Sequence, residues 1–133
     1  MNAQTERLTL SGPAGAIEAV RDSATLADGA APRGVAIIAH PHPLFGGTMD
    51  NKVVQTLARA FVQCGWTAVR FNFRGVGATA GVYDEGRGEL QDLLAVVEQV
   101  APAAAGQPLA LAGFSFGAFV TSHALEALWP TQR

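Results

Sequence analysis

The sequence has few charged residues and a single cysteine, and each scarcity excludes a class of protein. Charged side chains make up 15% of the 133 residues, and the nine Lys and Arg are scattered along the chain rather than clustered. With a net charge of -2, the sequence indicates no binding of nucleic acid or of an acidic membrane surface. Cys64 has no second cysteine for an internal disulfide, and we expect it to be a small core residue on a helix face.

Long hydrophobic runs are also missing, although 49% of the residues are hydrophobic. No run approaches the roughly 20 apolar residues that cross a membrane. Residues 1–7 lack the basic start and apolar core of a signal peptide, so we expect a cytoplasmic protein with no membrane partner. The length and composition predict one domain over residues 1–133 with much of the sequence buried.

Hydrophobic patterns predict strands that alternate with helices. Two alternating stretches, residues 6–10 and 15–20, flank the turn residues 11–13 and predict an antiparallel hairpin. Because parallel strands require crossover connections, the order of the later elements predicts a three-layer α/β/α fold with a mostly parallel sheet. These later elements are strands 34–39, 66–73 and 109–112, and helices that begin at 50 or 51, at 90 and at 116.

Turns that contain proline or glycine follow the predicted strands. The His-Pro-His-Pro turn at residues 40–43 follows one strand, and a glycine-rich loop at residues 74–88 follows the next. Because ligands of such sheets bind at the carboxyl ends of the strands, we expect these loops and Ser115 to converge at one edge. Arg74 is expected to pair with Asp84 or Glu85 within its loop.

Residues 113–117, Gly-Phe-Ser-Phe-Gly, follow an apolar run and have the pattern G-x-S-x-G. A serine between two glycines at a strand-to-helix corner projects its hydroxyl from a tight, strained turn. The pattern therefore predicts that Ser115 is a nucleophile. An oxyanion would be held by the backbone N–H of Phe116 and by a second N–H from the loop after strand 34–39, where the prolines leave His42 or Leu44 as the donor.

Three segments, AHPHPLFGGTMDNKVV, RFNFRGVGATAG and GFSFGA, together resemble the small bacterial serine hydrolases of the α/β-hydrolase superfamily. These include serine aminopeptidase or Xaa-Pro dipeptidyl-peptidase-like domains and dienelactone-hydrolase-like domains. The resemblance covers nearly the whole chain and implies hydrolysis of an ester, thioester or amide. It assigns the oxyanion amide to His42, although Pro41 stands where the superfamily has glycine.

The resemblance also implies a catalytic acid and a histidine after the serine, on loops of later strands. The 18 residues after Ser115 hold only His123 and Glu126 as candidates, both on the predicted helix. His123 is eight residues further on, about 12 Å along a helix axis, and cannot act as the base. We therefore expect a domain that is incomplete at its C-terminus, with impaired activity. The alternative is a non-catalytic fragment or pseudoenzyme that binds a ligand or partner.

The sequence also suggests the surroundings of Ser115. We expect His40, Leu44, Phe45 and Met49 to line a pocket, with an apolar acyl side that favours small ester or thioester substrates. No cofactor or metal is expected. Without further strands, residues 109–114 would form an open apolar sheet edge, which predicts self-association.

Two other interpretations of the motifs carry less weight. His40 and His42 at a strand end resemble the start of an amidohydrolase metal site, but His123 is the only other histidine and the chain is short for a (β/α)₈ barrel. The glycines at 75, 77 and 81 imitate a dinucleotide fingerprint. Rossmann glycines open directly into a helix, whereas residues 82–88 intervene here.

Overall fold

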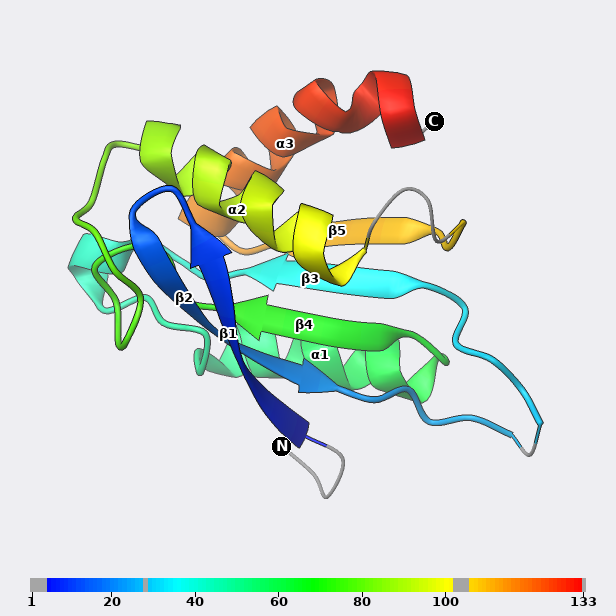
Figure 1. The fold of residues 1–133 in the computed structure, drawn as a ribbon. Helices are drawn as coiled ribbons and strands as arrows, with labels where there is room; N and C mark the ends of the chain where they lie inside the picture. Colours follow the sequence, from blue (N-terminus) through cyan, green and yellow to red (C-terminus); the bar gives the residue numbers. More distant parts are fainter. Residues whose placement is uncertain (1–4, 28, 102–105, 133) are drawn as a thin grey trace.

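The computed structural model describes residues 5–27, 29–101 and 106–132 and has one mixed sheet with helices on both faces (Figure 1). Helix α1 covers one face of the sheet, and α2 and α3 lie together on the other. This arrangement confirms the predicted three-layer α/β/α architecture. The elements in chain order are β1 (Thr5–Gly12), β2 (Gly15–Asp22), β3 (Val35–Ala39), the short 3₁₀ helix η1 (Pro43–Phe45), α1 (Lys52–Gln63), β4 (Thr67–Phe71), α2 (Arg87–Val100), β5 (Leu109–Gly113) and α3 (Phe116–Gln132).

The strands lie in the order β1-β2-β4-β3-β5. The β1–β2 hairpin is antiparallel, as expected, and β2 runs antiparallel to β4, whereas β4, β3 and β5 are parallel to one another. All five residues of β3 are buried, because this strand lies inside the sheet and under helices on both faces. The parallel strands therefore end at the same edge, where the loops that follow them meet (Figure 1).

Two apolar clusters hold the layers together. The larger lies between the sheet and helices α2 and α3 and includes Phe71, Phe73 and Leu93, which are fully buried. The smaller joins the sheet to α1 through Val54, Ala58 and their neighbours. Burial of this apolar surface is the main favourable term that fixes the helices on the sheet.

Helix α1 has a clear beginning and end. The Asn51 side chain accepts hydrogen bonds from the amides of Val53 (2.9 Å) and Val54 (3.2 Å), so it caps the helix as the sequence predicts. Cys64 lies one residue beyond the last helical residue and is exposed. The expectation that Cys64 packs in the core is therefore wrong, because the buried face of α1 runs through Val54, Ala58 and Val62 and does not include position 64.

Candidate active site

Three connections gather at the carboxyl edge of the parallel strands: the loop after β3, the loop after β4 and the turn from β5 into α3 (Figure 1). Ser115 lies in that last turn and is exposed. Its φ is +58°, a left-handed conformation that residues other than glycine rarely adopt. This is the strained backbone expected for a serine at a strand-to-helix corner.

The two glycines beside Ser115 permit close contacts that no larger residue allows. A Cβ at Gly113 would lie 2.5 Å from the backbone N of Ala118, which belongs to the first turn of α3. A Cβ at Gly117 would lie 2.2 Å from the carbonyl oxygen of Ala39, at the end of β3. The turn is therefore pressed between its own helix and the neighbouring strand, and the backbone at Ser115 is fixed from both sides.

Two backbone amides lie near this turn. Phe116 is the first residue of α3, so its N–H belongs to the unpaired donors of the helix N-terminus. His42 caps η1, and its ring centroid is 4.8 Å from that of Phe116, which places the loop after β3 against the serine turn. Within the described residues, no hydrogen-bond acceptor is found for either amide.

The loop that carries His42 is closed tightly on itself. The carbonyl oxygen of His42 accepts hydrogen bonds from the amides of Phe45 (3.1 Å) and Gly47 (3.0 Å). The Nδ1 atom of the same residue accepts from the amide of Leu44 at 3.1 Å. The Leu44 amide is therefore occupied by the His42 ring, so of the two candidate donors in this loop only His42 keeps an unengaged N–H among the described residues.

His40 lies inside the fold rather than on a pocket wall, which differs from the sequence expectation. Its side chain is 0% exposed, its Nε2 accepts from the amide of Phe73 (3.0 Å), and its Nδ1–H donates to the carbonyl oxygen of Pro41 (2.6 Å). Burial lowers the pKa of His40 to about 4, opposed by its hydrogen bond to Pro41. His40 is therefore a neutral residue that joins the end of β3 to the end of β4.

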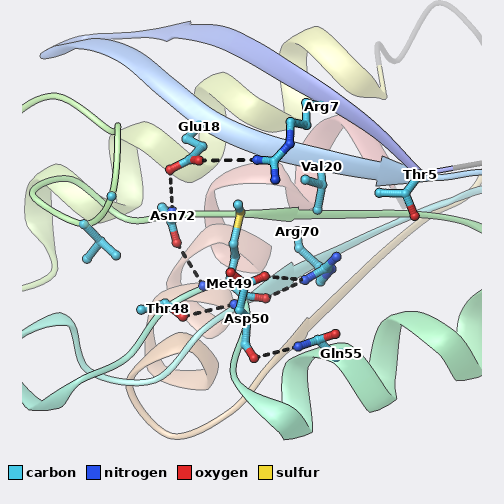
Figure 2. Close-up of a pocket in the computed structure, with 12 residues that line it drawn as sticks. Thr5, Arg7, Glu18, Val20, Thr48, Met49, Asp50, Gln55, Arg70 and Asn72 are labelled. Atoms are coloured by element: carbon cyan, nitrogen blue, oxygen red, sulfur yellow. Dashed lines mark hydrogen bonds and ion pairs between the residues drawn. The ribbon is translucent and has the colours of Figure 1, made fainter. Parts of the chain in front are cut away.

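Leu44 and Phe45 project from the site edge, whereas Met49 does not. Leu44 is 64% and Phe45 82% exposed, and the Phe45 ring lies 4.8 Å from that of His42. Met49 is 4% exposed and lines a separate polar cavity of about 380 Å³ (Figure 2). The expectation for Met49 therefore differs from its position: its backbone, not its side chain, supports the site loop.

That polar cavity is lined by the side chains that hold the loop after β3 in place by hydrogen bonds (Figure 2). Asn72 accepts from the amide of Met49 (2.9 Å) and donates to Glu18 on β2 (2.8 Å). The buried Arg70 donates to the carbonyl oxygen of Met49 (2.8 Å) and to Asp50 (3.2 Å). In the sequence this support is visible only as an Arg and an Asn two residues apart at the end of an apolar strand, a pattern that does not by itself indicate a role in holding a loop.

The glycine-rich loop after β4 is fixed by ion pairs and hydrogen bonds. Arg74 pairs with Asp92 on α2 at 2.9 Å, and this partner raises the pKa of Arg74. The expected pairing with Asp84 or Glu85 is therefore wrong. Glu89 accepts from the amides of Asp84 and Gly86, both at 2.9 Å, and thereby caps α2. The loop folds over the site as a wall and brings Tyr83 within 4.9 Å of His42, ring to ring.

Ser115 has no basic partner in residues 5–27, 29–101 and 106–132. Its hydroxyl has no hydrogen bond there. His123 is exposed on α3, and its ring lies 4.6 Å from that of Phe119. The same part of the chain holds no group of three or more His, Cys, Asp or Glu side chains able to bind a metal ion. None of its helices has the length and apolar content of a membrane span.

The chain is similar in sequence and structure to known serine hydrolases. Residues 30–132 match the serine aminopeptidase family S33. A crystal structure of an α/β serine hydrolase without a lid, from Xanthomonas campestris, is 45% identical and has a TM-score of 0.88; the match covers 97% of this chain and 59% of that one. A serine hydrolase homologue from Coxiella burnetii is 44% identical with a TM-score of 0.83, covering 94% and 58%.

One curated relative, an uncharacterised protein of Rickettsia prowazekii, is 41% identical over 117 residues. That match covers 86% of this chain and 47% of the relative. The chain therefore spans about half the length of its curated relative and somewhat more than half of the two solved structures.

Proposed function

Because the chain belongs to the serine aminopeptidase (S33) family of α/β hydrolases, we propose that it supplies the nucleophile and the oxyanion hole for cleavage of a small ester, thioester or amide. Ser115 is the nucleophile, and the amides of Phe116 and His42 hold the oxyanion. The observation that carries the proposal is the left-handed backbone of Ser115 between two glycines that no side chain could replace.

The proposed reaction has two steps. The Ser115 oxygen attacks the substrate carbonyl while its proton passes to a base, and two backbone N–H groups stabilise the charge that forms on the carbonyl oxygen. The bond to the leaving group breaks as that group takes up the proton. Water then adds to the acyl-serine, the acid leaves, and the Ser115 hydroxyl is restored.

In the part of the chain that the structure describes, no side chain is positioned to act as the base for Ser115. No histidine of the described residues contacts Ser115, and a positioned base contributes about 10²–10⁴-fold to such a step. We therefore infer that the 133-residue chain by itself reacts slowly, with Ser115 as the proposed nucleophile and the amides of Phe116 and His42 as the proposed oxyanion donors. The small apolar surface beside Ser115 favours uncharged esters and thioesters over charged substrates.

Labelling with a fluorophosphonate in the presence and absence of imidazole tests this proposal. We expect slow labelling of Ser115 alone, accelerated about tenfold or more by added imidazole, which replaces the base in solution. Peptide mass spectrometry identifies the modified residue. Ser115→Ala should abolish the labelling, whereas Ser122→Ala, an exposed serine on the same helix, should leave it unchanged.

A second candidate is a domain that binds a ligand or partner without turnover. The lack of any hydrogen-bond partner for the Ser115 hydroxyl in the described part of the chain favours it. A folded sample in which imidazole brings no labelling of Ser115 would support this alternative. Labelling that persists in Ser115→Ala would contradict the assignment of the nucleophile itself.

A further inference from the structure

Several aromatic side chains lie together beside the turn that carries Ser115. The His42 ring lies between those of Phe45, Tyr83 and Phe116, at centroid distances of 4.8, 4.9 and 4.8 Å. Phe116 continues the series to Phe119 at 6.3 Å. We propose that this site takes small carboxylic esters that carry an aromatic ring, an inference that rests on the proposed function and names its substrate class.

The rings come from all three connections that meet at the site edge. His42 and Phe45 belong to the loop after β3, Tyr83 to the loop after β4, and Phe116 and Phe119 to the first turns of α3. Phe116 follows the proposed nucleophile directly in the chain, so this set of rings lies beside the turn that carries Ser115. We call these five residues the ring cluster.

The ring cluster packs against the core on one side and is exposed to solvent on the other. The Phe116 ring packs against the fully buried Phe73 at 5.4 Å with an interplanar angle of 80°, which fixes its orientation. Phe45 and Phe119 are 82% and 52% exposed, so much of their ring surface is available to a ligand. A rigid lower ring with exposed rings around it is suited to hold a flat apolar group by edge and face contacts.

The composition of the cluster distinguishes aromatic from aliphatic ligands. Aromatic pairs contribute about 0.5–1.5 kcal/mol beyond the area that they bury, which a saturated ring of the same size does not gain. This difference corresponds to about two- to tenfold in affinity. An aliphatic chain would be held by the apolar area that it buries alone, without this additional term.

Binding of two matched esters tests the inference without requiring turnover. Methyl benzoate and methyl cyclohexanecarboxylate have the same carbon skeleton, but only the first has a π system. We expect the 133-residue chain to bind methyl benzoate about two- to tenfold more tightly, with the largest amide shifts in NMR spectra at the ring cluster. Equal affinity for the two esters, or shifts confined to other regions, would overturn the inference.

Variants assign the preference to particular rings. Phe45→Leu and Phe119→Leu keep apolar side chains at exposed positions, so we expect the fold to be retained. The ratio of the affinities for methyl benzoate and methyl cyclohexanecarboxylate should fall towards one in these variants. Phe61→Leu is the control, because Phe61 lies on α1, packs against the Trp66 ring and is outside the ring cluster. A preference that survives both cluster substitutions would also contradict the inference.

The outcomes separate this inference from the proposed function. If Ser115 is labelled by the fluorophosphonate but the two esters bind equally, the ring preference alone is wrong. If methyl benzoate is preferred but Ser115 is not labelled even with imidazole, the catalytic proposal is wrong and the cluster is a ligand-binding surface. Ser115→Ala should keep the preference in binding and lose the labelling.

Discussion

At the scale of single residues, the backbone conformation of Ser115 has a cost in stability. A residue with a Cβ in the left-handed region is less stable by about 1–2 kcal/mol than in the ordinary helical region. At Gly113 and Gly117 a Cβ would clash with neighbouring backbone, so the turn needs glycine at both positions. The sequence could reveal this residue because the strain requires glycine at two fixed positions, and that requirement is visible as a pattern.

This strain predicts an increase in stability when the proposed nucleophile is removed. Ser115→Gly should raise the free energy of unfolding by about 0.5–1 kcal/mol, since relief of the strain exceeds the extra entropy of glycine in the unfolded chain. Ser122→Gly, in the interior of α3, should lower it by about 0.5 kcal/mol. Urea unfolding of the two variants measures both values, and a loss of stability in Ser115→Gly would contradict the argument.

At the scale of elements, the His40 side chain links the ends of the parallel strands β3 and β4 by hydrogen bonds. Its neutral ring accepts the amide of Phe73 and donates to Pro41, so the end of β3 is tied to the chain just after β4. A protonated ring could not accept from Phe73, and the imidazolium would be buried without a counter-charge. The position of the loop after β3 therefore depends on the protonation state of this histidine.

The lowered pKa of His40 gives a definite dependence of stability on pH. The unfolded chain takes up the proton near pH 6.5, but the folded chain does so only near pH 4. The contribution of neutral His40 to the free energy of unfolding is therefore fully present above pH 6.5. It is lost as the pH decreases towards 4, which lowers the free energy of unfolding by up to about 3 kcal/mol. NMR of the imidazole nitrogens should show a neutral Nδ1–H ring at pH 5, and an imidazolium at that pH would contradict this prediction.

The types of the elements could be predicted from the sequence, whereas the side-chain contacts between residues far apart in the chain could not. The patterns of β3, β4 and α1 are local, so their approximate ranges follow from apolar spacing and from the Asn51 cap. The burial of His40 depends on an amide 33 residues away, and no local pattern carries that information. Likewise, Arg74 pairs with Asp92 on α2 because the intervening loop turns back over the helix.

At the scale of the whole molecule, the sheet is unevenly protected. The hairpin covers one side of β4, but within the described residues β5 pairs with β3 alone. Phe114, Phe119 and Leu125, on and after the turn that follows β5, are between 43% and 55% exposed. A strand with one unpaired row of backbone N–H and C=O groups and no charge is a template for another strand.

We propose that β5 of one copy pairs with β5 of a second copy. The sequence Leu-Ala-Leu-Ala-Gly is uncharged, so two copies can lie side by side without repulsion between like charges. Light scattering should give a mass that rises above the monomer with concentration. Ala110→Lys places a charge on that edge and should return the mass to that of the monomer, while circular dichroism checks that the fold is kept. A wild-type chain that stays monomeric at the highest concentration would contradict the proposal.

The polar support behind the loop after β3 has a consequence for catalysis. Asn72 and Arg70 hold Met49 by its amide and carbonyl (Figure 2). His40 holds the start of the same loop. The His42 amide is therefore oriented when the chain folds, before any substrate arrives. Under the proposed function, the oxyanion hole is preorganised: its dipoles need no reorganisation as charge develops on the substrate, and the free energy of folding has already fixed them.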